Sequence, residues 1–487
     1  MLSEFFLKIP YLLFFIPLIT SIVIYYIEDQ KFTVNVIYTM LTAMIFLTFN
    51  ILFKVEDVAT YIFVNTSGKF NILGGEFKIS VPSIFFLLLV LICNFIGFIN
   101  YINNILTNNT INRRCLKYFF VVYVTYIFST VGIMLTYNIF NLFIFLEVYS
   151  FCMYIMVSIY RNKNLNIVSY KYFSNNIFGS ILSMLSLFYM SVYFNTSNML
   201  NIKQQLLTIN LKDNVGIFLI FILFVFSLII KFFTMSTSRY YNTDFSGISF
   251  LSISNIFVNV LIGIYLMLEI VFFIFDSRAL LDIPLLRVMV FITFGLIIIY
   301  NSVRCLTVKD KSLYNIFVRF NLVSLGYIML ATFLYDNGLK SSWALLFSHS
   351  FEFVSVNLTV YIFLTIISTI YNHNDVSLIN DNKFFKFFLM FVILYKIFLP
   401  IGTSLYTNTY FVTYVIKNRN FLYLLPFLIN KISYAFLFLD IYENNRIADV
   451  SRDRIVSTKH LYKLYFSIFL LLVITIVFEV FFQKYNF

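Results

Sequence analysis

Residues 141–160 read NLFIFLEVYSFCMYIMVSIY, an apolar run with a single carboxylate, Glu147, near its middle. A run of this length can cross a bilayer as a helix. A carboxylate at that depth costs ~2.5 kcal/mol or more unless it is protonated or paired. Further along the chain, Lys231 directly follows the apolar run GIFLIFILFVFSLII. We therefore expect Glu147 and Lys231 to contact each other inside the membrane and to begin a path for charge.

Two interpretations of this pair remain open. Burial in apolar surroundings lowers the pKa of a lysine, and a neighbouring carboxylate raises it again. A change in the separation of the two groups would therefore load or release a proton. The other interpretation is a static ion pair that only fixes helix packing, and the residue types alone favour neither.

The composition indicates an all-α polytopic membrane protein. The chain has 487 residues, of which 61% are hydrophobic and 11% are charged, too few charges to cover a soluble protein of this size. The four cysteines lack paired spacing and predict no disulfide framework, iron–sulfur cluster or zinc site. No basic cluster interleaved with aromatic residues indicates a nucleic-acid partner. The abundance of Phe, Ile, Tyr, Asn and Lys is typical of an AT-rich genome, such as an organellar one.

Apolar runs separated by short polar loops predict about 14 transmembrane helices in a single membrane domain, residues 1–487. Their approximate ranges are 5–27, 32–53, 81–102, 117–136, 138–160, 167–193, 214–236, 247–275, 285–303, 312–334, 341–370, 387–416, 420–441 and 461–482. Residues 54–80 form the longest early loop, and within it NTSGKFNILGGEFKIS (65–80) alternates apolar and polar side chains on either side of Gly74-Gly75, which predicts a β-hairpin on the membrane surface. Lys and Arg are more frequent in the odd-numbered loops, so we expect both termini opposite the cytoplasm or matrix.

Other polar residues within or beside the apolar runs are candidates for a proton relay. Asn255 and Asn259 are four residues apart and share a helix face. His349 and Glu352 are one turn apart and lack a third metal ligand nearby in the sequence, which favours a relay over a metal site. The further candidates are Ser238 after an expected helix break, Lys311, Arg319, Lys396 and Lys431.

Five stretches, in order over about residues 68–330, resemble the antiporter-like membrane subunits of respiratory complex I. That family is related to subunits of multisubunit cation/proton antiporters. The stretches are GGEFKISVPSIFFLLLVLI, TYNIFNLFIFLEVYSF, SYKYFSNNIFGS, LIIKFFTM and FNLVSLGYIML. Within the family, the pieces YKYF and SLGY are most similar to NADH dehydrogenase (ubiquinone) subunit 2, whereas LLFSHSF is also similar to subunit 4.

The resemblance implies a fold and a function. The fold has N-terminal helices and a surface hairpin (1–116), two inverted five-helix repeats (117–275 and 285–441) with broken helices seven and twelve, and a last helix (461–482). Glu147 would tune the proton affinity of Lys231, and protons would follow a central row of polar groups. The chain would work as a subunit of H⁺-translocating NADH:ubiquinone reductase, with no redox centre of its own.

The resemblance also implies a location and partners. The expected location is the mitochondrial inner membrane, with both termini on the intermembrane-space side. The expected partners are other membrane-arm subunits of complex I and lipids such as cardiolipin. NADH, FMN, iron–sulfur clusters and ubiquinone are expected in other subunits, so this chain is expected to bind no cofactor.

Three departures from the family pattern keep alternatives open. The family commonly has a histidine after the lysine of helix seven, and the corresponding position here is near Ser238. The family's basic residue of helix eight corresponds to the stretch from Asn255 to Asn259. Its lysine or glutamate of helix twelve corresponds to Asn408. Lys396 lies twelve residues before Asn408, ~18 Å along a helix, and is not an obvious replacement. The alternatives are a structural, non-conducting subunit of the same complex, a free-standing cation/proton antiporter, and a membrane enzyme using His349 and Glu352.

Overall fold

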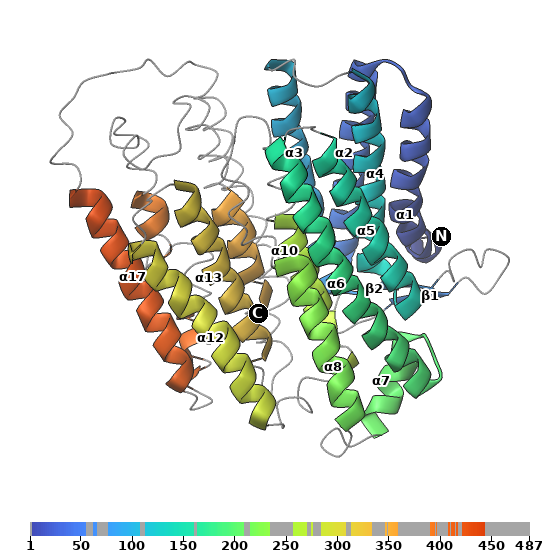
Figure 1. The fold of residues 1–487 in the computed structure, drawn as a ribbon. Helices are drawn as coiled ribbons and strands as arrows, with labels where there is room; N and C mark the ends of the chain where they lie inside the picture. The colour runs from blue at the N-terminus through green and yellow to red at the C-terminus, as the bar shows by residue number, and fades with distance from the viewer. Residues whose placement is uncertain are drawn as a thin grey trace, which may run out of the picture. The chain divides into compact units, whose positions relative to one another are not determined.

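A computed structural model provides the structure (Figure 1). The described residues are 2–54, 62–65, 76–107, 113–159, 163–208, 215–233, 257–269, 274–275, 284–307, 313–333, 346–347, 349–358, 390–394, 396, 408–409, 411–413, 415–416 and 421–443. The chain divides into a first unit, Met1–Thr243 with Gly247–Ala279, and a second unit, Asp244–Ser246 with Leu280–Phe487. The candidates Ser238, Asn255 and Lys311, the residues Gly74-Gly75 and the predicted last helix lie outside the described residues.

The described elements of the first unit are mainly long helices. They are α1 (Leu2–Tyr26), α2 (Gln30–Lys54), β1 (Ile62–Asn65), β2 (Glu76–Ile79), α3 (Val81–Thr107), α4 (Arg113–Leu135), α5 (Ile139–Ser158), α6 (Lys163–Phe194), α7 (Met199–Thr208), α8 (Val215–Leu228), the π-helix η1 (Ile229–Phe233) and α10 (Asn259–Leu268). Antiparallel pairing of β1 with β2 confirms a hairpin, but Asn65 lies opposite Glu76, so residues 66–75 connect the strands and the predicted turn centred on Gly74-Gly75 is wrong. All ten residues of α10 are buried, and α10 packs on α3, α4, α8 and η1. It is therefore the central helix of this unit.

The second unit is described at fewer positions. Its elements are α12 (Pro284–Thr307), α13 (Leu313–Phe333), the 3₁₀ turn η6 (Phe421–Tyr423) and α17 (Leu424–Glu443). The described residues of 349–358 and of 390–416 are also helical, within the ranges predicted for the eleventh and twelfth spans. α12 packs against both α13 and α17.

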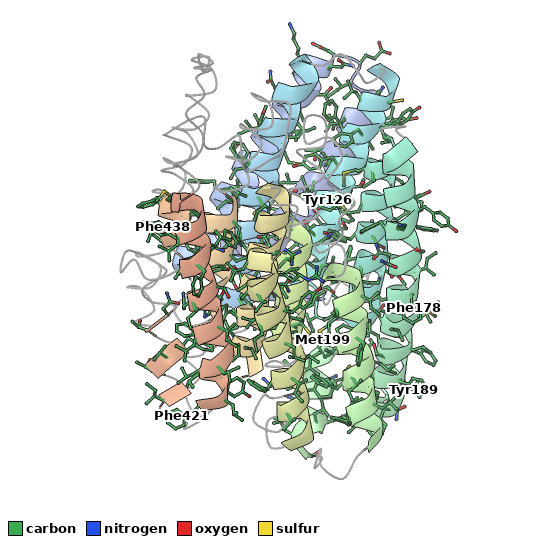
Figure 2. All side chains as sticks on the ribbon, turned by 60° about the vertical axis from the view of Figure 1, so that its left-hand side comes forward. Tyr126, Phe178, Tyr189, Met199, Phe421 and Phe438 are labelled. Carbon is green, nitrogen blue, oxygen red and sulfur yellow. The ribbon has the colours of Figure 1, made fainter. Side chains whose placement is uncertain are left out.

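Six helices of the described part are long and apolar enough to cross a membrane, and four shorter ones are strongly apolar. The outer face of α6 carries exposed apolar side chains, among them Phe178 and Tyr189, which point away from the helix bundle in Figure 2. A soluble monomer rarely exposes a continuous apolar surface of this extent. The chain is therefore a multi-pass membrane protein, and the predicted count of 14 spans stays a prediction.

Three connections of the first unit meet at one end of its helices. Phe77 of β2 bridges Thr136, which joins α4 to α5, and Asn138 bridges Asn198, which joins α6 to α7. The side chain of Asn138 also caps α5 and donates to Ser197 Oγ at 3.2 Å. Each of these connections follows an even-numbered predicted span. A chain that crosses the membrane back and forth brings all such connections to the same side, so their contacts agree with the predicted spans.

The helix α7 lies in a stretch that the sequence analysis left as a polar loop. Its buried side chains are Met199, Ile202 and Leu206, spaced three and four apart as on one helix face. This spacing predicts an amphipathic helix. The average hydropathy of the stretch is low because the opposite face of the helix is polar, so an average over the stretch misses it. Figure 2 shows Met199 at the start of this helix.

Candidate functional site

The Lys231 ammonium lies 2.6 Å from Glu147 Oε1, so the contact predicted from the sequence is present. The other carboxylate oxygen, Oε2, accepts a hydrogen bond of 2.9 Å from the Ser180 hydroxyl. The side chain of Lys231 is 2% exposed and that of Glu147 is 37% exposed. Three helices thus converge on one carboxylate: α5 supplies it, α6 supplies the hydroxyl and η1 supplies the ammonium.

Local backbone geometry brings Lys231 to this position. The α-helix α8 changes to the π-helix η1 at Ile229–Phe233, with Lys231 in its middle. A π-turn widens the helix by one residue and is often found at functional sites. On the facing helix, a Cβ added at Gly179 would lie 2.6 Å from Lys231 Cγ. The missing side chain of Gly179 therefore makes room for the lysine stem.

We expect Gly179→Ala to displace Lys231 and weaken its contact with Glu147. Overpacking of this kind costs about 1–3 kcal/mol, so both thermal stability and transport should fall. The matched control is Gly216→Ala on α8, where an added Cβ meets nothing within 4 Å and the change should be neutral or slightly stabilising. Thermal unfolding of the two purified variants measures the difference. Equal behaviour of both variants would contradict the role given to Gly179.

A separate polar contact near the pair joins α5 to α10. Tyr149, two residues after Glu147, donates a hydrogen bond through its hydroxyl to Asn259 Oδ1. The ring of Tyr149 stacks on Tyr126 of α4, with centroids 5.0 Å apart. Asn259 was a predicted relay residue. Ser180, Tyr149 and Tyr126 were not, because hydroxyl groups are common in apolar helices and give little sequence signal.

A groove of about 350 Å³ between α5 and α6 opens beside the pair. Glu147, Asn176 and Ser180 contribute its polar lining, and Phe151, Phe173 and Ile177 contribute apolar side chains. Glu147 therefore has one face against Lys231 and one face toward this groove. In a membrane the groove must be filled by lipid or by another protein, and a carboxylate side chain is poorly matched to acyl chains.

In the second unit, Lys396 is 4% exposed and is the centre of a similar arrangement. Its ammonium donates to Asn357 Oδ1 at 2.8 Å and to Ser324 Oγ at 3.2 Å. It also lies over the ring of Phe320, 5.1 Å from the centroid. The backbone oxygen of Lys396 accepts a hydrogen bond of 2.6 Å from Lys431 Nζ on α17. The sequence analysis placed Lys396 among relay candidates but did not predict these partners.

A small cavity lies beside Lys396. Its volume of about 30 Å³ is enough for one or two water molecules. Most of the polar residues that line it are the predicted candidates: His349, Glu352, Lys396, Asn408 and Lys431, together with Ser324, Tyr327 and Asn430. The sequence thus identified residues that are scattered over some 80 positions and that the fold gathers around one cavity.

His349 and Tyr327 make further contacts around this cavity. His349 Nδ1 lies 3.9 Å from Glu352 Oε2, and its ring is nearly parallel to that of Tyr327. The Tyr327 hydroxyl accepts from Asn430 Nδ2 at 3.1 Å. His349 Nε2 is buried with no hydrogen-bond partner, which leaves it able to bind a water molecule. Within the described residues, no group of three His, Cys, Asp or Glu side chains that could hold a metal ion is present.

Arg319, the remaining described candidate, is half-buried on α13, one residue before Phe320. The structure thus places it on the same helix as Ser324, a little more than one turn away.

No protein-family model and no curated protein sequence matches the chain. Solved structures match it over most of its length. A chain of the membrane-bound sulfane sulfur reductase, an archaeal respiratory membrane complex, superposes with a TM-score of 0.74 at 13% identity, covering 98% of this chain and 96% of that chain. A chain of the Mrp complex from Dietzia sp. DQ12-45-1b gives a TM-score of 0.72 at 12% identity, covering 91% of this chain and 81% of that one. The chain therefore shares its fold with chains of these two membrane complexes.

Proposed function

We propose that this chain is an antiporter-like membrane-arm subunit of proton-pumping NADH:ubiquinone oxidoreductase and that it contributes to proton translocation. The observation that carries the proposal is the contact between Glu147 and Lys231, with the lysine buried in a π-helix. A change of helix geometry at η1 alters the distance between the two charges. Because each charge sets the proton affinity of the other, such a change moves a proton.

The second unit supports the same proposal. In each unit a buried lysine on a late helix belongs to a hydrogen-bonded cluster with side chains from two earlier helices. Lys231 pairs with Glu147 on α5, whose other carboxylate oxygen accepts from Ser180 on α6. Lys396 donates to Ser324 on α13 and to Asn357 on the next helical segment. In both proposed repeats, these residues lie on the second and third helices. Two repeats of the same fold would place them at equivalent positions in this way.

The proposal includes partners and a location. The groove beside Glu147 favours coverage by another membrane subunit of the complex, because a neighbouring helix can offer polar groups that acyl chains lack. Lipids such as cardiolipin would occupy the remaining apolar surface. The proposed location is the mitochondrial inner membrane with both termini in the intermembrane space, and the redox cofactors and ubiquinone would be bound by other subunits.

Purification from native membranes in mild detergent, followed by reconstitution into liposomes, tests the proposal. We expect the chain to co-purify with NADH dehydrogenase subunits, and NADH oxidation by quinone to acidify one compartment. Recovery of the chain without redox subunits would contradict the assignment to that complex.

A cation/proton antiporter is the second candidate function, favoured by the shared fold with a chain of the Mrp complex. It predicts proton movement driven by an imposed sodium or potassium gradient in the absence of NADH. The same liposomes distinguish the two candidates, because only the antiporter needs a cation gradient.

A further inference from the structure

A second buried ion pair lies at the other end of α10. Lys78 of β2 pairs with Glu269, the residue that follows the last turn of α10. The Lys78 side chain is fully buried and that of Glu269 is 9% exposed. Asn259, which contacts Tyr149 near the first pair, begins the same helix ten residues earlier, ~15 Å along its axis. The central helix of the first unit thus has Glu269 of the second pair at its end and, at its start, a contact with the helix that carries Glu147.

Buried polar groups occur on α4 and α10 over the length that separates the two sites. On α4, Tyr126, Thr130 and Met134 follow each other at four-residue intervals and share a face. The Met134 carbonyl accepts a hydrogen bond of 2.8 Å from the hydroxyl of Tyr265 on α10. Tyr265 is four residues before Glu269 and shares its face. Both the Thr130 and Ser129 hydroxyls are buried, which gives further oxygen atoms along this route.

The pair also lies at the hairpin, which the sequence predicts to lie on the membrane surface. Lys78 belongs to the hairpin, and its neighbour Phe77 bridges the connection between α4 and α5. Lys203 of α7 is half-buried and near enough for its positive charge to act on Lys78. Burial, followed by this positive charge, lowers the pKa of Lys78. The charged and titratable groups described around the site are therefore Lys78, Lys203, Glu269 and Tyr265.

We propose that Lys78 and Glu269 form the proton-exchange site through which the first unit takes up or releases protons at the face that carries the hairpin. In the charged form, Lys78 is an ammonium and Glu269 a carboxylate. Transfer of one proton from Lys78 to Glu269 gives an amine and a carboxylic acid with no change in net charge. The acid then releases this proton to water at the hairpin face, and the amine takes the next proton from the route along α4 and α10. This inference rests on the proposed proton translocation.

The test uses the double variant Lys78→Met with Glu269→Leu in the whole reconstituted complex, with the pH of each compartment varied separately. Replacement of a buried ion pair by apolar side chains often leaves stability unchanged, so assembly should persist. We expect a ~100-fold loss of transport, which is the smallest effect typical of removing a positioned proton-transfer group. Transport should also stop depending on the pH of one compartment, while its dependence on the pH of the other compartment remains. Wild-type transport with unchanged dependence on both pH values would overturn the inference.

Two further variants separate the possible failures. Lys203→Gln keeps the pair and removes the positive charge that lowers the pKa of Lys78, so the one-sided pH profile should move to higher pH. If the pH profile of Lys203→Gln is the same as that of the wild type, the inference is overturned, and this holds even where the double variant fails to assemble. Lys117→Met on α4, a partly buried lysine that lies over Tyr25, is the control and should behave as wild type. Should Lys231→Met transport normally, the proposed function fails, rather than this inference alone.

Discussion

Replacement of Lys231 by Met is expected to reduce proton translocation to about 1% of wild type while the complex still assembles. Methionine fills a similar volume but cannot carry a proton, and removal of a positioned proton-transfer group typically costs about 100-fold or more. Glu147 would then lack its cation. Because its side chain is 37% exposed and borders the groove between α5 and α6, the unpaired carboxylate is not sealed inside the helix bundle, and the helices should stay together.

The readout is the ratio of protons moved to NADH oxidised in reconstituted liposomes. Lys117→Met is the matched control, since it removes a lysine from the same unit that has no contact with the pair. Lys231→Arg is a second comparison. It keeps the charge, yet a guanidinium does not release its proton at physiological pH, so translocation should stay low. Normal translocation by Lys231→Met would mean that the ion pair only holds the helices together.

Replacement of Lys396 by Met is expected to have the second largest effect. Lys396 is the buried cation that contacts both Ser324 and Asn357, and it borders the cavity with His349 and Glu352. Its loss would leave Asn357 Oδ1 without this donor, at a cost of about 1–3 kcal/mol, and would interrupt the polar row of the second unit. We expect a loss of translocation comparable to that of Lys231→Met, together with a modest loss of thermal stability.

Asn408→Leu is the informative comparison for Lys396. The family resemblance aligns Asn408, not Lys396, with the lysine or glutamate of helix twelve, and Asn408 also lines the cavity. Because an amide cannot take up a proton, its replacement should affect translocation far less. A larger effect for Asn408→Leu than for Lys396→Met would show that the second unit does not use Lys396, and would favour the structural, non-conducting alternative.

The sequence predicted the contact between Glu147 and Lys231 because a charged side chain within a long apolar run must be paired or neutralised. Glu147 lies in the middle of such a run and Lys231 near the end of one, where a partner or neutralisation is required. Fold class followed from the same apolar runs. The helix bounds agree within a few residues for α2, α3 and α5, since the ends of apolar runs coincide with the first polar loop residues.

The partners of these charges could not be predicted in the same way. Ser180 and Tyr149 are weakly polar, and such residues are common in membrane helices without any special role. Lys78 lies just before an expected span, where charged residues normally meet water, and Glu269 lies inside the eighth expected span. The sequence did not show that the fold buries the two together. Lys396 was recognised as buried, but its partners depend on how α13 and the next segment pack.

The most direct test of the central claim is proton translocation by the complex carrying both Glu147→Gln and Lys231→Met. This double variant removes both charges at once and leaves neither stranded, so helix packing should survive. If the pair loads and releases protons, the assembled complex will oxidise NADH with translocation reduced to the level of Lys231→Met. If the double variant moves protons as the wild type does, the pair is a static contact, and the proposed mechanism is wrong.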